Sequence, residues 1–249
     1  MNKILKLSLS LTTLLALNAC NGGESSPKNT SSLELPTEVE TALASEKSML
    51  TQELIDTISY MGNEERLAYD VYNELYRQYG TKQFTNIAAK SEYKHITAVQ
   101  ELVQKYILND DINFTNVDLP ALGYINTPIE NMQAGTYDIA KIQGLYDSLV
   151  SQGATSEIDA LKVGCIIEVV DVTDLDSYIT LAEKSNASDI VTVFNFLRDG
   201  SYNHYWAFDK GLKKAGVENG CYVEGDALLT NKEDVYPTKE NLGNGHSKN

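Results

Sequence analysis

The sequence predicts an all-α fold, arranged as a four-helix bundle, on two observations. Apolar residues recur at helical spacing over long stretches that begin at capping residues and end before glycines. No strand-like alternation of comparable length competes with them. The expected order is two long helices, a long crossover that includes a short extra helix, and two more long helices, which is one of the standard connectivities of such bundles.

The first two long helices are bounded by threonine and glycine residues. Thr51 is expected to cap a helix that runs to about Tyr79, before Gly80. Thr85 is expected to cap the next helix, which runs to about Leu108. These two helices form the first half of the predicted bundle.

A long irregular stretch separates the two halves. Residues 109–135 contain Pro120 and Pro128, which argue against a helix running through them. The helices expected after this stretch are a short one near residues 138–151 and two long ones at about 156–184 and 188–215.

The N-terminus has the layout of a secretory signal. Residues 1–19 contain two lysines, then an apolar stretch too short to span a bilayer comfortably, then small residues. The letters LNAC at positions 17–20 match the bacterial lipoprotein box, which predicts cleavage before Cys20 and acylation of that residue. An ordinary signal with an incidental cysteine is the alternative. With Asn21 next, we expect a lipid-anchored protein of the cell envelope, at the outer membrane and facing the periplasm or the cell surface.

Composition divides the rest of the chain. Residues 20–47 are rich in Ser, Thr and Glu and are expected to form a flexible tether. Residues 48–229 are enough for one helical domain with a core, and residues 230–249 are expected to be a disordered polar tail. The formal net charge of −15 repels phosphate backbones, and no basic stripe offsets it, so nucleic acid is not an expected partner.

Each long helix carries side chains of metal-ligand type on its apolar face. On the first helix, Glu65 lies near the centre of the apolar stripe and Glu64 lies further off. On the second, Glu92 and His95 flank the midline. The inward residues of this kind on the last two helices are Glu168, Asp171 and His204.

This coincidence predicts a metal centre. Carboxylates that face one another in a closed core repel and take up protons unless cations lie between them. A Glu from one helix and a Glu-x-x-His from its neighbour are a recognised way to enclose di-iron or di-manganese centres. Oxygen and imidazole ligands suit iron, manganese or zinc, and their affinity for the ion is expected to fall below about pH 6, near the reference imidazole pKa. For any one of these residues alone, a core group satisfied by protein contacts is the alternative.

Four blocks of the sequence resemble the signature of a known family. They are EERLAYDVYNELY at 64–76, FTNIAAKSEYKH at 84–95, LYDSLVSQGATSEIDALKVGCIIEVVDVTDL at 145–175 and LRDGSYNHYWAF at 197–208. In this order they are similar to a ferritin-like domain family of unknown function, found in bacteria and archaea and distantly related to rubrerythrin. The resemblance covers about Thr51 to Gly216. It implies a ferritin-like bundle with iron as the first choice of metal, and its implied ligands are Glu65, Glu92, His95, Glu168 and His204.

One position departs from the pattern of the wider ferritin-like group. The residue three before His204 is Ser201, where a second Glu-x-x-His would have a glutamate. Asp171, three after Glu168, is the candidate sixth ligand that could replace it; otherwise the centre holds one metal or an asymmetric pair. Tyr72 shares the inward face of the first helix, and core packing is the preferred role for it.

Two cysteines remain when Cys20 is acylated. In an oxidising compartment, Cys165 and Cys221 would close a disulfide that pins the C-terminal segment to the third long helix. A buried Cys165 with a free thiol at Cys221 is an equal alternative.

Three functional classes stay open. The first is a di-iron or di-manganese oxidoreductase that oxidises ferrous iron or reduces peroxide; its electron donor is unknown, because the chain has no Cys-x-x-Cys rubredoxin module. The second is a protein that sequesters metal at the envelope or uses it to hold the bundle together. The third is an interaction module with salt-bridged inward charges, although Arg66 and Lys94 are expected to face outward. The expected partners are metal ions, the membrane through the lipid, and a second copy of the chain.

Overall fold

The computed structural model describes residues 34–107, 129, 132–137, 139–229 and 236–238. Regular secondary structure within these residues is helical, which confirms the all-α prediction. The predicted signal peptide, Cys20 and the tether as far as residue 33 lie outside the described residues, and so does most of the predicted crossover. No helix in the described ranges is long and apolar enough to cross a membrane.

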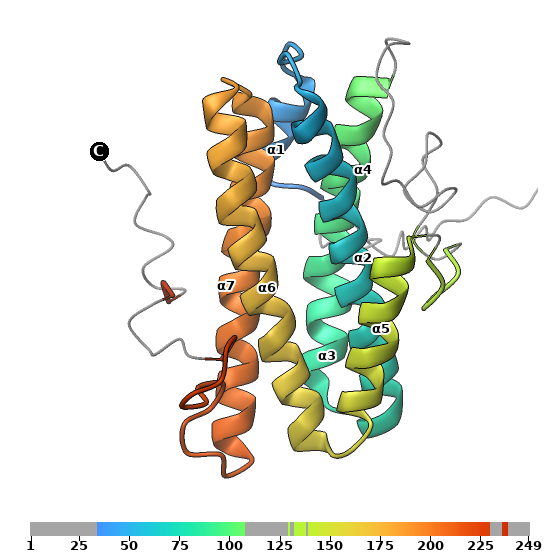
Figure 1. The fold of residues 1–249 in the computed structure, drawn as a ribbon, viewed down its shortest axis with the longest axis vertical. Helices are drawn as coiled ribbons and strands as arrows, with labels where there is room; N and C mark the ends of the chain where they lie inside the picture. The colour runs from blue at the N-terminus through green and yellow to red at the C-terminus, as the bar shows by residue number, and fades with distance from the viewer. Residues whose placement is uncertain (1–33, 108–128, 130–131, 138, 230–235, 239–249) are drawn as a thin grey trace, which may run out of the picture. The chain divides into compact units, whose positions relative to one another are not determined.

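The longest helices pack along one another (Figure 1). They are α2 (Gln52–Tyr79), α4 (Tyr93–Ile107), α6 (Glu157–Lys184) and α7 (Ser188–Lys214). Helices α6 and α7 share the most extensive contact, and α2 lies against both α4 and α6. The shorter helices are α1 (Thr37–Ala44), α3 (Lys82–Ile87) and α5 (Ala140–Gly153).

Local capping explains where the long helices begin and end. The Thr51 side chain accepts a hydrogen bond from the Leu54 amide at the start of α2, and Gly80 ends that helix at φ 70°. At the start of α6, Ser156 accepts a hydrogen bond from the Asp159 amide. The bounds predicted for α2, α6 and α7 are therefore confirmed within about one residue.

The predicted second helix consists of three joined pieces. It begins at Lys82, earlier than expected, and Thr85 lies inside α3 rather than at its cap. A π-helical turn, η1 (Ala88–Glu92), separates α3 from α4. Such turns widen the helix by one residue and change the direction of the side chains that follow. The turn ends at Glu92, the first predicted ligand of this segment.

Part of the predicted tether is helical and packed. Residues 37–44 form α1, which lies against α7 and α4. Its Val39 side chain is fully buried in the same apolar cluster as residues of α2 and α7. The prediction of a flexible tether as far as residue 47 is therefore wrong at its C-terminal end, because Val39 and Ala42 share a face that the composition of the segment obscures.

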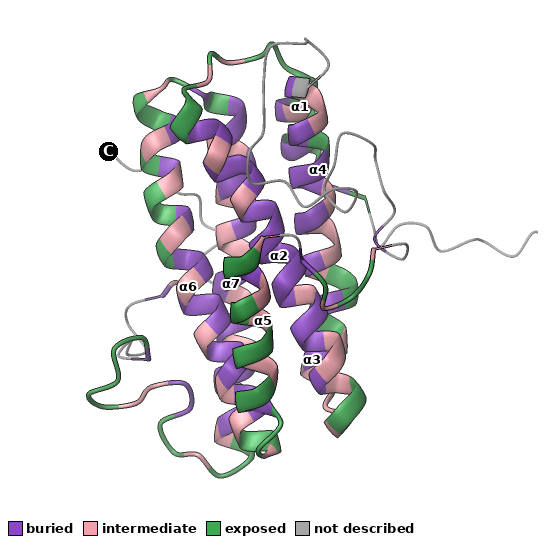
Figure 2. Cartoon of the chain, turned by 45° about the vertical axis from the view of Figure 1, so that its right-hand side comes forward, coloured by how far each residue is buried: buried purple, intermediate pink, exposed green. Residues whose placement is uncertain are grey.

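The core is divided into two apolar clusters by a layer of polar side chains. One cluster takes residues 54–61 of α2 and the other takes residues 67–75 of the same helix. Glu64 and Glu65 lie between these two stretches, and both are buried. Figure 2 shows the buried positions of the long helices in purple. The long helices thus converge on a buried polar layer rather than on a continuous apolar core.

The segment after α7 folds back on that helix. A disulfide joins Cys165 of α6 to Cys221, and both residues are fully buried. Within the stretch expected to be a disordered tail, Tyr236 is buried against Tyr205, and the Pro237 carbonyl accepts a hydrogen bond from the Trp206 indole. Residues 236–238 are therefore part of the packed body.

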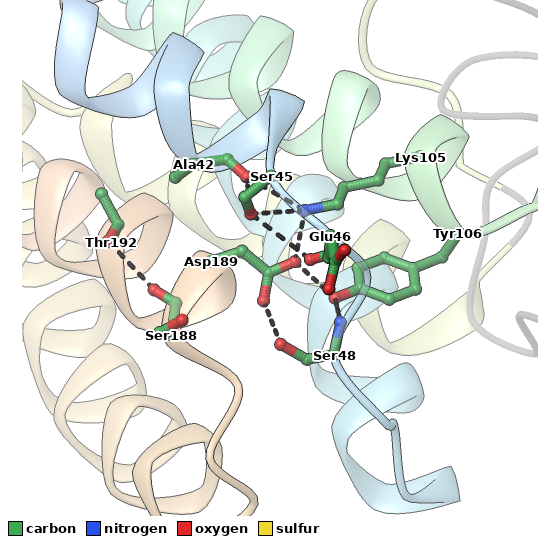
Figure 3. A network of polar contacts seen from close by, with 9 residues as sticks. All are labelled: Ala42, Ser45, Glu46, Ser48, Lys105, Tyr106, Ser188, Asp189 and Thr192. Atoms are coloured by element: carbon green, nitrogen blue, oxygen red, sulfur yellow. Dashed lines mark hydrogen bonds and ion pairs between the residues drawn. The ribbon is translucent and has the colours of Figure 1, made fainter.

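A second buried polar network lies at the end of the helices where α1, α4 and α7 meet (Figure 3). The Lys105 ammonium donates to the Asp189 carboxylate at 2.6 Å and to the Ala42 carbonyl at 3.0 Å. Asp189 also accepts from Ser48 at 2.7 Å and from the Tyr106 hydroxyl. Although burial opposes it, these hydrogen bonds lower the pKa of Asp189 below its usual value. The network fixes the end of α1 and the linker before α2 to the start of α7.

Lys105→Met is expected to lower the free energy of unfolding by about 3–5 kcal/mol, because it leaves the Asp189 carboxylate buried without its cation. Lys162→Met breaks an exposed pair with Asp159, 3.9 Å apart, and is expected to cost less than about 1 kcal/mol. Adding Asp189→Asn to Lys105→Met should recover part of the loss. Chemical denaturation measures all three, and equal losses for the two lysine variants would contradict this account.

Candidate metal centre

Five of the six predicted ligands come together in the polar layer. The described part of the chain holds two groups of three side chains whose ligand atoms lie within 4.8 Å of one another. The first group is Glu65, Glu92 and His95, and the second is Glu92, Glu168 and His204. All five side chains are buried, and they come from α2, η1, α4, α6 and α7.

Glu92 belongs to both groups and turns one oxygen to each. Its Oε2 lies 3.0 Å from His95 Nδ1, and its Oε1 lies 3.0 Å from His204 Nδ1. Glu65 Oε2 completes the first group at 2.9 Å from His95 Nδ1. Glu168 Oε2 completes the second at 3.4 Å from His204 Nδ1. A carboxylate in this position can bridge two cations, each with one further carboxylate and one imidazole.

Several polar atoms of this layer have no hydrogen-bond partner. They are Glu65 Oε1, both Glu92 oxygens, Glu168 Oε2, His95 Nε2 and His204 Nδ1. The Glu92 oxygens approach the two imidazoles closely but make no hydrogen bond with them. Unsatisfied buried acceptors are costly, and three carboxylates face only two imidazoles in these groups. Cations between the carboxylates would satisfy these oxygens, so the residues present fit a bound metal.

Two local features hold His95 in place. The π-helical turn ends at Glu92, so that Glu92 and His95 both face inward at the start of α4. On the other side of the ring, Gly200 of α7 leaves room for it, because a Cβ at Gly200 would lie 2.3 Å from His95 Nε2. The Phe196 ring packs edge-on against the imidazole, with centroids 5.3 Å apart. An isolated glycine inside a helical pattern is the sequence signal that could have identified this contact.

Tyr72 acts beside the second group. Its hydroxyl donates a short hydrogen bond to Glu168 Oε1, while its ring packs against Phe84 and Phe208. The sequence favoured packing alone for this residue, and the structure adds an orienting contact. Because Tyr72 occupies Oε1, the other oxygen of Glu168 is the one that faces His204.

The charges of the layer are strongly coupled. Burial raises the pKa of Glu65 to about 7, although His95 opposes this. Burial also opposes protonation of His95, but the carboxylates of Glu65 and Glu92 raise its pKa to about 9. Glu92 has a lowered pKa despite burial, because it faces His204 and His95. Burial likewise opposes protonation of His204, but Glu92 and Glu168 raise its pKa well above the usual value. In the absence of a cation, both imidazoles therefore carry protons that offset the charge of the carboxylates.

Asp171 belongs to neither group, although it is only 3 % exposed. Burial and the nearby carboxylates of Glu65 and Glu168 raise its pKa well above the usual value. Ser201 is buried too, and its hydroxyl donates to the Leu197 carbonyl at 3.2 Å. The carboxylate that is missing before His204 is thus not replaced within the two groups, which share Glu92 instead.

Glu64, which was predicted to lie further from the centre of the apolar stripe than Glu65, is buried as well. It is 5 % exposed, and burial together with Asp174 raises its pKa well above the usual value. Helix α5 covers this flank of α2, and its Lys141 approaches Glu64 and Tyr60 there.

Arg66 also lies inside, so the prediction that it faces outward is wrong. Its guanidinium donates to the carbonyls of Gln133 and Thr136 at 2.6 and 2.8 Å and stacks over the Tyr137 ring. It therefore fixes residues 133–137 to α2 and is not one of the charges of the two ligand groups.

The region that carries this layer is similar to known proteins. A family model described as "Uncharacterized protein domain (DUF2202)" matches residues 54–122 and 122–224, which include all six predicted ligands. The chain is 36% identical over 170 residues to the uncharacterized protein MJ0754 of Methanocaldococcus jannaschii, across 68% of this chain and 80% of that protein. It is also similar to the crystal structure of hypothetical protein MJ0754 from Methanococcus jannaschii, with a TM-score of 0.57 and 35% identity, across 70% of this chain and 87% of that one.

Proposed function

The chain belongs to the DUF2202 family, and we propose that its domain is a ferritin-like four-helix bundle built around a two-metal centre, with iron as the resident metal. The observation that carries this proposal is Glu92, which shares its two oxygens between two buried groups of ligand type. Carboxylates combined with imidazoles also suit manganese and zinc. The family description assigns no reaction, so the chemistry rests on the donor set alone.

We further propose an oxidoreductase, with ferrous iron or peroxide as substrate. A bound iron pair supplies one-electron redox chemistry in a site that the protein keeps apolar on both sides. The protein side chains orient the ligands: Tyr72 hydrogen-bonds to Glu168, and the Gly200 backbone leaves room for the His95 ring. The sequence holds no rubredoxin-like cysteine pair, so electrons come from the substrate or from another protein.

A non-catalytic metal-binding role is the second candidate. The ligand layer joins the two apolar clusters of the core, so an ion there would also cross-link α2, α4, α6 and α7. The salt-bridged interaction module is less well supported, because the two imidazoles leave buried carboxylate oxygens without partners.

Anaerobic reconstitution of the full chain with ferrous iron, followed by metal analysis, tests the proposal. We expect about two irons per chain, and iron oxidation by oxygen or peroxide faster than that of the free ion. Tightly held zinc without redox activity would favour the non-catalytic role. Binding of iron, manganese and zinc no greater than that of a denatured control would exclude the metal centre.

Metal affinity is expected to fall as the pH decreases below about 9. This is a higher pH than the value of about 6 expected from the reference imidazole pKa. His95 and Glu65 must lose their protons to bind an ion, and their pKa values are raised to about 9 and about 7. Each proton displaced costs about 1.4 kcal/mol of binding per pH unit below its pKa. Competition with a chelator between about pH 6 and 9 measures this, and a constant affinity would contradict it.

The stability of the apo protein should change with pH in the opposite direction to the metal affinity, and should fall as the pH rises. The folded state raises the pKa of His95 from 6.5 to about 9 and so holds its proton more tightly than the unfolded chain does. This contribution to stability is complete below about pH 6.5 and is lost as the pH rises through about 9. Denaturation of the apo protein across that window measures it as a fall in the free energy of unfolding.

The lipid anchor at Cys20 remains a proposal, with the membrane as partner and the cell envelope as location. It is supported by the LNAC letters at positions 17–20. We expect wild-type protein in the detergent-extracted membrane fraction and Cys20→Ala protein outside it. A Cys20→Ala variant that still partitions with the membrane would argue for another means of attachment.

A further inference from the structure

A pocket of about 560 Å³ opens over α7 in the described part of the chain, and none of the members of the two ligand groups lines it. Its wall includes Phe196 and Asp199 of α7, Glu183 of α6 and Glu38 of α1. Phe196 is half-buried, whereas Glu38 and Glu183 are exposed. The pocket is therefore open to solvent on one side and bounded by an aromatic ring on another.

Phe196 connects this pocket to the metal centre. Its ring meets the fully buried His95 ring edge-on, with an interplanar angle of 85°. One helical turn later, the backbone of Gly200 lies against His95 Nε2 with no side chain between them. A single aromatic side chain thus contacts a candidate ligand and also lines a pocket that is open to solvent. Rotation of Phe196 would expose the His95 side of the centre without any change in the helices.

The charge of the pocket selects what could enter. Glu38, Glu183 and Asp199 contribute three carboxylates to its wall. The one cationic side chain in the wall is Arg198. Its guanidinium lies 2.6 Å from the Asp176 carboxylate, which offsets its charge. A concave surface of this sign raises the local concentration of cations and repels anions.

We propose that this pocket is the entrance by which divalent cations reach the metal centre and that Phe196 is its gate, an inference that rests on the proposed metal-binding function. Phe196 offers no ligand atom, so opening the gate lowers the barrier to entry and to exit equally. The rates of binding and release then change by the same factor, and the equilibrium affinity stays constant. A residue that only packs the core would instead change stability or affinity.

Loading of the apo full-length protein with Co²⁺, followed by its visible absorbance, tests the gate without any catalytic assay. Phe196→Ala is expected to load and release Co²⁺ about tenfold faster, which corresponds to a barrier about 1.4 kcal/mol lower, with unchanged affinity. Phe196→Leu keeps an apolar side chain, so its loading rate should lie between those of the wild-type protein and Phe196→Ala. This comparison separates gating from loss of packing.

The pocket charges are tested by Glu38→Gln combined with Glu183→Gln. This variant is expected to load Co²⁺ severalfold more slowly at low ionic strength and at the wild-type rate in high salt. Glu218→Gln combined with Glu224→Gln is the matched control, because it removes the same charge from exposed residues beyond α7. The control should load at the wild-type rate.

The outcomes separate this inference from the proposed function. Wild-type protein that takes up no Co²⁺ would overturn both. Uptake by wild-type protein with an unchanged rate in Phe196→Ala would overturn the gate and leave the metal centre intact, as would a change in affinity without a change in rate. Equal slowing by the pocket pair and the control pair would show that net charge matters and would overturn the entrance.

Discussion

Glu92→Gln protein is expected to retain less than about one metal ion per chain, against the two or so expected for wild-type protein. Glu92 is the one residue common to both ligand groups, with an oxygen 3.0 Å from each histidine. An amide in its place has a single oxygen and no charge, so it can neither bridge two cations nor offset their mutual repulsion. Metal analysis after reconstitution and removal of free ions gives the stoichiometry.

Variants in a single group provide the comparison. His95→Ala removes a residue of the first group and His204→Ala one of the second, so each should lower the stoichiometry to about one. Asp171→Asn is the matched control, because it replaces a buried carboxyl group that belongs to neither group with an amide of the same shape. Wild-type occupancy is expected for it. A loss in Asp171→Asn as large as that in Glu92→Gln would restore Asp171 as a ligand and contradict the two-group arrangement.

The clustering of the candidate ligands could be predicted because each lies on an apolar stripe whose period is fixed by the α-helix. Glu65, Glu168 and His204 lie where a regular helix places them. The division of the ligands between two groups could not be predicted in this way, because it depends on distances between helices. The bridging position of Glu92 follows from the π-helical turn before it, and such a turn has no periodic signal.

Helical periodicity also assumes one buried face, and α2 has more than one. It packs against α4, α5 and α6, so that Glu64 is buried away from the centre of the stripe, and Arg66 is buried although it was expected to face outward. The neighbours that cover these flanks come from α5 and from residues 133–137, beyond the crossover. When a segment that is distant in the sequence and partly irregular covers a flank of a helix, the sequence of that helix alone does not indicate the burial. The short helix α1 was missed for a related reason, since only its Val39 and Ala42 are buried.

Gly200 is the position where a single methyl group should do most damage to the site. The Cβ of an alanine there would lie 2.3 Å from His95 Nε2 and 2.4 Å from Cε1. The ring has little freedom to retreat, because its Nδ1 faces Glu65 and Glu92 at 2.9 and 3.0 Å on the opposite side. Gly144, on α5, is also a helical glycine, but a Cβ there would meet no atom within 4 Å.

Gly200→Ala is therefore expected to weaken metal binding by about 10- to 100-fold, since it displaces a ligand that the surrounding contacts hold in place. Gly144→Ala should leave affinity unchanged and raise the free energy of unfolding by about 0.5–1 kcal/mol, because alanine is the better helix former. The two variants make the same chemical change in the same type of secondary structure, so a difference in affinity between them reports the contact with His95. Chelator competition gives the affinities, and chemical denaturation of the apo proteins gives the stabilities. If Gly200→Ala binds metal as tightly as Gly144→Ala, the His95 ring either moves freely or does not bind the ion, and the first ligand group must be abandoned.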